Sequence, residues 1–162
     1  MQEKPILYVD VDGVISLWGF DPNSRPPGAF TAVDGIPHFL SSEAGEHLLG
    51  LGGTFELVWC TGWEEKANEH LVPALGLPTP LEWLSFDATR GPGHTTPGHW
   101  KLPAIDAHAG TRPAAWVDDA FNEACFKWAR ERSAPTLLVE TSPAVGLVEA
   151  HVARLRAFAE RL

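Results

Sequence analysis

The sequence is poor in cysteine, in basic residues and in long apolar runs, and each shortage excludes a class of protein. Cys60 and Cys125 are the only cysteines among 162 residues, which excludes a disulfide framework and is typical of a reducing compartment. The 12 Lys and Arg residues are outnumbered by 21 Asp and Glu residues, so the sequence lacks the basic surface that binds long nucleic acid or an anionic membrane. Because no apolar run approaches the length of a bilayer span, we expect a cytoplasmic protein with no membrane partner.

The composition that remains is that of one globular unit. Hydrophobic residues make up 44% of the chain and charged residues 20%, which is ordinary for a globular domain. A chain of this length can bury a core without disulfides or structural metal. We therefore expect residues 1–162 to form a single domain, and the composition leaves oligomer formation open.

The most informative stretch is an apolar run that ends in two aspartates and a glycine. Ile6 to Val9 have no polar face and predict a buried strand. Asp10 and Asp12 follow it on one side of the chain, and Gly13 permits a sharp turn or the close approach of a ligand. Two nearby carboxylates repel each other, so a divalent cation is their simplest companion. A local turn, which aspartate also favours, is the alternative.

Apolar runs alternate with amphipathic segments along the rest of the chain. Further strands are expected at 55–60, 81–86, 114–117 and 136–139, and helices near 43–51, 64–75, 102–108, 121–129 and 147–162. This alternation predicts an α/β fold with a five-stranded parallel sheet and helices on both faces. Residues 14–40 interrupt the alternation as a Pro- and Gly-rich flap, in which Asp34-Gly35 predicts a tight hairpin.

Polar residues also follow two other predicted strands. Thr61 and Gly62 come after the second strand, and Asp118 and Asp119 after the fourth. Parallel strands bring their carboxyl ends to one edge, where ligands bind in open α/β sheets. Thr61 and Gly62 would then lie at a helix N-terminus that favours an anion, although Thr61 is equally suited to be a plain helix cap.

In order and context, four segments resemble the motifs of the haloacid dehalogenase-like (HAD) superfamily of phosphohydrolases. They are Asp10-Val11-Asp12-Gly13-Val14, Thr61-Gly62, Lys101 and Val117-Asp118-Asp119. More narrowly, Trp59-Cys60-Thr61-Gly62-Trp63-Glu64 and residues 112–119 and 134–139 look like the small bacterial branch named for Swiss-army-knife RNA repair proteins. The resemblance implies a Rossmann-like HAD domain with a flap but, given the short insertions, no full cap.

The resemblance also implies roles for the four aspartates. Asp10 would be the nucleophile that takes the phosphoryl group as an aspartyl-phosphate, and Asp12 would be the general acid and then the general base. Asp10, the backbone carbonyl of Asp12, and Asp118 or Asp119 would hold Mg²⁺, a hard ion that prefers oxygen ligands.

The same resemblance implies a substrate-binding set. Thr61 would donate a hydrogen bond to a phosphoryl oxygen, and Lys101 would offset charge on the phosphoryl group and the nucleophile. Gly13 and Gly62 would let backbone approach the phosphate. Trp63 follows the phosphate-binding turn directly and is predicted to contact the substrate.

These residues together predict a Mg²⁺-dependent phosphomonoesterase with a slight preference for a small nucleotide or sugar phosphate. A polynucleotide end or a phosphoprotein would also fit an open site, although the acidic charge disfavours long nucleic acid. Two non-hydrolytic alternatives remain: a phospho-accepting signalling domain and a binding module that kept the fold.

Other conspicuous residues receive structural interpretations. His94 and His99 lie in a Gly- and Pro-rich loop without regular zinc-ligand spacing. Cys60 is expected to be buried at a strand end with no base beside it. Arg112 could bind an anion or form a structural salt bridge, and the tryptophans other than Trp63 are expected in the core.

Overall fold

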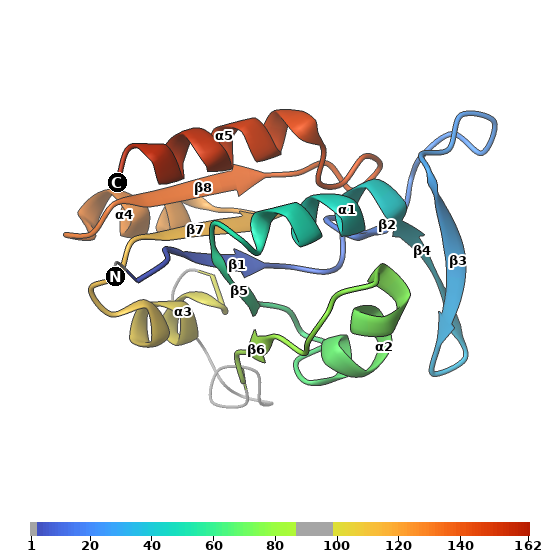
Figure 1. The fold of residues 1–162 in the computed structure, drawn as a ribbon, viewed down its shortest axis with the longest axis horizontal. Coiled ribbons are helices and arrows are strands. Elements are labelled where there is room, and N and C mark those ends of the chain that lie inside the picture. Colours follow the sequence, from blue (N-terminus) through green and yellow to red (C-terminus); the bar gives the residue numbers. More distant parts are fainter. Residues whose placement is uncertain (1–2, 87–98) are drawn as a thin grey trace.

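The computed structural model describes residues 3–86 and 99–162 and contains a five-stranded parallel sheet (Figure 1). Its strand order is β6-β5-β1-β7-β8, and all four neighbouring pairs run parallel. The strands are β1 (Ile6–Val9), β5 (Glu56–Trp59), β6 (Glu82–Trp83), β7 (Ala114–Asp118) and β8 (Thr136–Glu140). The predicted α/β fold and parallel sheet are confirmed, and the architecture is Rossmann-like.

Helices cover both faces of this sheet, as the alternation of side chains along the strands requires. They are α1 (Ser42–Leu51), α2 (Lys66–Leu75), α3 (Leu102–Ala109), α4 (Glu123–Glu131) and α5 (Glu149–Glu160). On β1, Leu7 and Val9 face a core shared with α1, α2 and α5. Ile6 and Tyr8 face the opposite core, shared with α3 and α4. Among the described residues, no helix is both long and apolar enough to cross a membrane.

A small antiparallel sheet inserted after β1 forms the flap. It contains β2 (Ser16–Leu17), β3 (Gly28–Val33) and β4 (Ile36–Ser41), in the order β2-β4-β3. Asp34 and Gly35 join β3 to β4 with φ angles of 51° and 80°, which a two-residue turn of this type requires. The hairpin is therefore where the sequence predicts it. Figure 1 shows it at the end of the main sheet toward which the arrows of β1 and β8 point.

The elements differ from prediction mainly around α2 and at the sheet edge. Residues 61–65 form turns, and Glu64 adopts a φ of 52°, so α2 begins at Lys66 rather than at Glu64. Thr61 and Gly62 consequently lie one turn before the helix and not at its first residues. β6 pairs with β5 at two positions only and is therefore shorter than the strand expected at 81–86.

Two tryptophans expected in the core are exposed instead. Trp18 is 50% exposed at the end of β2 and Trp83 is 37% exposed on the edge strand β6. Trp18 directly follows the two-residue strand β2, and Trp83 ends the two-residue edge strand β6. The buried pair is Trp59 and Trp116, at the centre of the sheet on opposite faces.

Candidate active site

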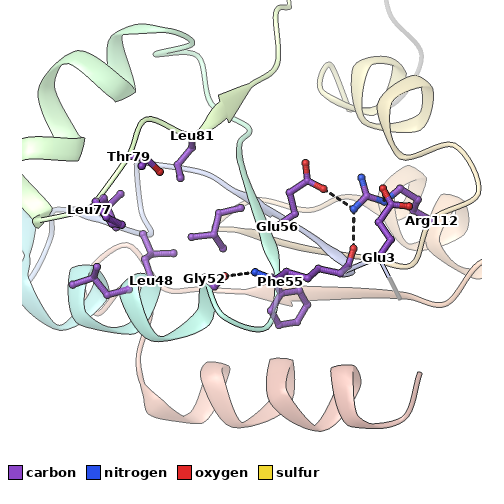
Figure 2. Close-up of a pocket in the computed structure, with 13 residues that line it drawn as sticks. Glu3, Leu48, Gly52, Phe55, Glu56, Leu77, Thr79, Leu81 and Arg112 are labelled. Atoms are coloured by element: carbon purple, nitrogen blue, oxygen red, sulfur yellow. Dashed lines mark hydrogen bonds and ion pairs between the residues drawn. The ribbon is translucent and has the colours of Figure 1, made fainter. Parts of the chain in front are cut away.

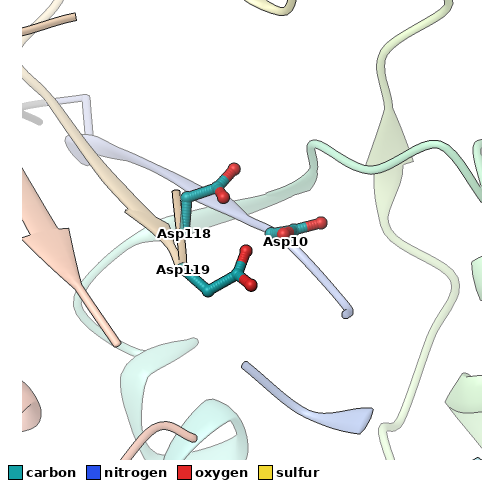
Figure 3. Close-up of side chains that lie close together, drawn as sticks. All are labelled: Asp10, Asp118 and Asp119. Carbon is teal, nitrogen blue, oxygen red and sulfur yellow. The ribbon is translucent and has the colours of Figure 1, made fainter. Parts of the chain in front are cut away.

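The carboxyl ends of β1 and β7 bring three carboxylates together. These strands are neighbours in register, with Val9 opposite Val117, so the residues that follow are adjacent. Carboxylate oxygens of Asp10, Asp118 and Asp119 all lie within 4.8 Å of one another, and Figure 3 shows them at this edge. Asp10 and Asp118 are buried and Asp119 is half-buried. Three oxygen donors at this spacing could hold a metal ion.

Lys101 is the buried cation of this cluster. Its Nζ lies 2.6 Å from Asp118 Oδ2 and 3.2 Å from Asp10 Oδ1, and the side chain is almost fully buried. Lys101 directly precedes α3, so a loop far from β1 in sequence places it there. One lysine offsets only part of the charge of three carboxylates, which leaves the cluster net negative.

Burial and this uncompensated charge shift the pKa values of the residues in the cluster. Burial raises the pKa of Asp10 to about 8; the charge of Lys101 opposes this shift, and that of Asp118 adds to it. Burial and the neighbouring Asp118 raise the pKa of Asp119 to about 6. Burial disfavours the cation at Lys101, but the charges of Asp10, Cys60 and Asp118 and the hydrogen bond to Asp118 together outweigh burial and raise the pKa of that amine. Without an added cation, burial and the neighbouring charge therefore favour a bound proton on Asp10 and on Asp119.

Asp10 is held by one of its two oxygens. The backbone N–H of Val11 donates to Oδ1 at 2.8 Å, and the Lys101 ion pair falls on the same atom. Oδ2 is therefore the oxygen that neither Val11 nor Lys101 engages.

Asp12 lies outside the carboxylate cluster and is exposed. Its Oδ2 accepts a hydrogen bond from Trp63 Nε1 at 3.1 Å. The ring of Trp63 in turn packs edge-on against His38 of β4, with centroids 4.9 Å apart. The flap therefore supports the residue that orients Asp12. The sequence did not predict the hydrogen bond from Trp63 to Asp12; it predicts only that Trp63 contacts the substrate. That substrate contact stays a prediction, and so does metal binding by the Asp12 carbonyl.

The glycine after Asp12 is required by a close approach. Gly13 adopts a φ of 83°, and a Cβ on it would clash with the carboxylate of Asp119. Its carbonyl accepts a hydrogen bond from Thr141 Oγ1 at 2.8 Å. Thr141 is buried just beyond β8, and sequence reasoning missed it. The only available signal was its place after a fifth strand.

Thr61 is buried, two residues beyond the end of β5. Its Oγ1 accepts from the backbone N–H of Trp63 at 3.2 Å, which stabilises the turn before α2. A hydroxyl that accepts a hydrogen bond still carries a proton to donate, so its predicted contact with a phosphoryl oxygen stays open.

A hollow of about 290 Å³ opens over the carboxylate cluster. Its lining includes six of the predicted site residues: Asp10, Asp12, Gly62, Lys101, Asp118 and Asp119. His99 also lines it, but its ring nitrogens face backbone groups, with Nε2 3.0 Å from the Ala120 carbonyl and Nδ1 3.2 Å from the Lys101 N–H. His99 therefore orients the loop, and His94 lies outside the described residues.

The remaining candidates have structural roles. Cys60 is fully buried and burial raises the pKa of its thiol, which disfavours a thiolate nucleophile. Arg112 forms ion pairs with Glu3 and Glu56 at the amino ends of the strands, so its salt-bridge interpretation is confirmed. Figure 2 shows these pairs at the rim of a hollow of about 470 Å³. That hollow lies at the opposite edge of the sheet from the carboxylate cluster.

Comparison with protein-family models found no match, and comparison with curated proteins found none either. The resemblance to the HAD superfamily therefore stays an interpretation of the residues.

Proposed function

We propose that this chain is a Mg²⁺-dependent phosphomonoesterase of HAD type that acts through an aspartyl-phosphate on Asp10. The observation that carries the proposal is the buried Lys101 bridging Asp10 and Asp118, with Asp119 alongside, at the carboxyl edge of a parallel sheet. A purely structural ion pair would need only one carboxylate for one lysine.

The three clustered carboxylates fit a hard cation. Asp10, Asp118 and Asp119 would hold Mg²⁺, which would screen the negative charge of the carboxylates and of the phosphoryl group. The raised pKa of Asp10 supports this, because a bound cation would replace the proton that this buried carboxylate otherwise retains.

The resemblance to the HAD superfamily implies the chemical steps, and the positions of Asp10 and Asp12 are compatible with them. An Asp10 oxygen attacks phosphorus as the ester P–O bond breaks, and Asp12 gives its proton to the leaving oxygen. The carboxylate of Asp12 then takes a proton from water, which attacks phosphorus and releases phosphate and Asp10. Asp12 suits both tasks because it is exposed at the hollow and fixed by Trp63. Lys101 and Thr61 would stabilise charge on the phosphoryl oxygens.

The test is phosphate release from a panel of nucleotides, sugar phosphates, phosphopeptides and 3′- and 5′-phosphorylated oligonucleotides, with Mg²⁺ or with EDTA. We expect Mg²⁺-dependent release by the wild type and none by Asp10→Asn. Asp34→Asn, at the exposed hairpin turn, is the matched control and should retain full turnover. Absence of release from every substrate, or equal release by Asp10→Asn, would contradict the proposal.

A further inference from the structure

A further hollow, of about 420 Å³, lies on the flap side of Asp12 and is called the flap hollow below. Its lining includes Asp12, Trp18, Phe20, Phe30, His38 and Phe39. Asp12 also lines the hollow over the carboxylate cluster, so the two hollows share it. A group bonded to phosphorus through an oxygen next to Asp12 would therefore extend into the flap hollow.

The flap hollow is built from aromatic side chains, two of which are exposed. Phe39 is buried and packs against Phe20 and Phe30, with ring centroids 4.8 and 5.2 Å apart. Phe30 is itself 61% exposed and Trp18 is 50% exposed. Exposed aromatic side chains that line a hollow are typical of a surface that receives a partner. A flat aromatic group is the partner that such faces bind best, through stacking.

The charge of the lining also restricts which leaving groups this hollow can bind. Among the described residues that line this hollow, Asp12 is the only one with a charged side chain, and no lysine or arginine contributes. A leaving group with further phosphates, such as a polynucleotide, would meet a carboxylate with no cation to offset it. A neutral aromatic leaving group meets no such penalty. His38 and Ser16 add polar atoms at the wall, which suits a heterocycle better than a hydrocarbon ring.

We propose that the flap hollow is a base-binding subsite and that the substrate is a nucleoside monophosphate, with its base against Trp18 and Phe30. The identity of the leaving group rests on the proposed phosphomonoesterase function, because Asp12 is taken to protonate the nucleoside oxygen. Selectivity would then reside in the flap.

The experiment compares adenosine 5′-monophosphate with ribose 5-phosphate, which lacks the base. For Phe30→Ala and Trp18→Ala we expect the ratio of the two kcat/KM values to fall about tenfold, since base stacking on an aromatic side chain contributes about 1–3 kcal/mol. Ile36→Ala is the matched control, because Ile36 is equally exposed, at 60%, on the same hairpin but does not line the hollow. A ratio that stays constant in both aromatic variants, or that falls equally in Ile36→Ala, would overturn the subsite.

A binding measurement separates this subsite from the phosphatase activity. Calorimetric titration of the wild type with adenosine and with ribose needs no turnover. Tighter binding of adenosine that is lost in Phe30→Ala would support the subsite even if every phosphate were left intact and the proposed function failed. Equal binding of adenosine by wild type and Phe30→Ala would overturn the subsite even in an active phosphatase.

Discussion

Replacing Lys101 with methionine tests the charge balance on which the proposed chemistry depends. Methionine keeps an unbranched chain of similar length but removes the ammonium group, which lies 2.6 Å from Asp118 Oδ2 and 3.2 Å from Asp10 Oδ1. Breaking a buried ion pair by removing one partner costs about 3–5 kcal/mol, because the other charge stays buried and uncompensated. Here Asp118 loses its ion-pair partner, whereas Asp10 loses less, because its raised pKa of about 8 keeps it mostly protonated at neutral pH.

We therefore expect the free energy of unfolding of metal-free Lys101→Met to fall by about 3 kcal/mol at neutral pH. In a domain of this size such a loss lowers Tm by about 6–12 °C. Urea titration in EDTA, followed by tryptophan fluorescence, measures the first quantity, and thermal unfolding the second.

The matched control is Lys66→Met. Lys66 pairs with Asp34 at 3.0 Å, but both side chains are more than half exposed, so solvent screens the pair and its loss should matter little. If Lys101→Met unfolds no more readily than Lys66→Met, the buried charge cluster is not formed as described.

The remaining predictions concern Asp10, the metal and Trp63. Asp10→Asn should be at least as stable as the wild type in EDTA, because the change removes a buried carboxylate that repels Asp118; a clear loss of stability in the same urea titration would contradict this. Mg²⁺ at 100 times its Kd should increase the free energy of unfolding by about 2.7 kcal/mol and so raise Tm. Ca²⁺ should bind but support little turnover, because it favours longer bonds and more ligands. Asp10 also sets how the metal-free stability depends on pH, because its pKa rises from 3.8 in the unfolded chain to about 8 in the folded protein. Between these two values folding takes up a proton. The contribution of Asp10 to stability is therefore greatest below pH 3.8 and is lost as the pH rises to about 8. Stabilisation by Mg²⁺ should grow over the same window, and a pH-independent Mg²⁺ effect would contradict the raised pKa. Trp63→Phe keeps an aromatic ring against His38 but loses the N–H donor to Asp12, so kcat/KM should fall about fivefold for every substrate, the effect of losing about 1 kcal/mol of hydrogen bonding; unchanged kinetics would show that Trp63 does not orient Asp12.

Local patterns were sufficient to predict the sheet and the flap hairpin. The run Ile6 to Val9 has only one way to be buried on both faces, and Asp34-Gly35 supplies the two positive φ angles that a tight hairpin needs. Parallel pairing then brings Asp10 beside Asp118, so the proximity of these aspartates followed from the fold class alone.

Contacts between segments far apart in sequence could not be predicted in this way. The hydrogen bond from Trp63 to Asp12 and the one from Thr141 to Gly13 each depend on how a loop follows its strand. The start of α2 was misplaced because helical periodicity around residue 64 does not reveal the positive φ of Glu64. The exposure of Trp18 likewise depends on where the flap lies relative to the main sheet, which composition does not encode.

Hydride trapping of the intermediate tests whether the phosphoryl group is transferred to Asp10. Borohydride added during turnover reduces an aspartyl-phosphate to homoserine, which mass spectrometry of the peptide containing residue 10 detects. We expect this conversion at Asp10 only when both Mg²⁺ and a substrate are present, and none at Asp12, Asp118 or Asp119. Rapid Mg²⁺-dependent phosphate release with no reduction at Asp10, or reduction at another aspartate, would contradict it.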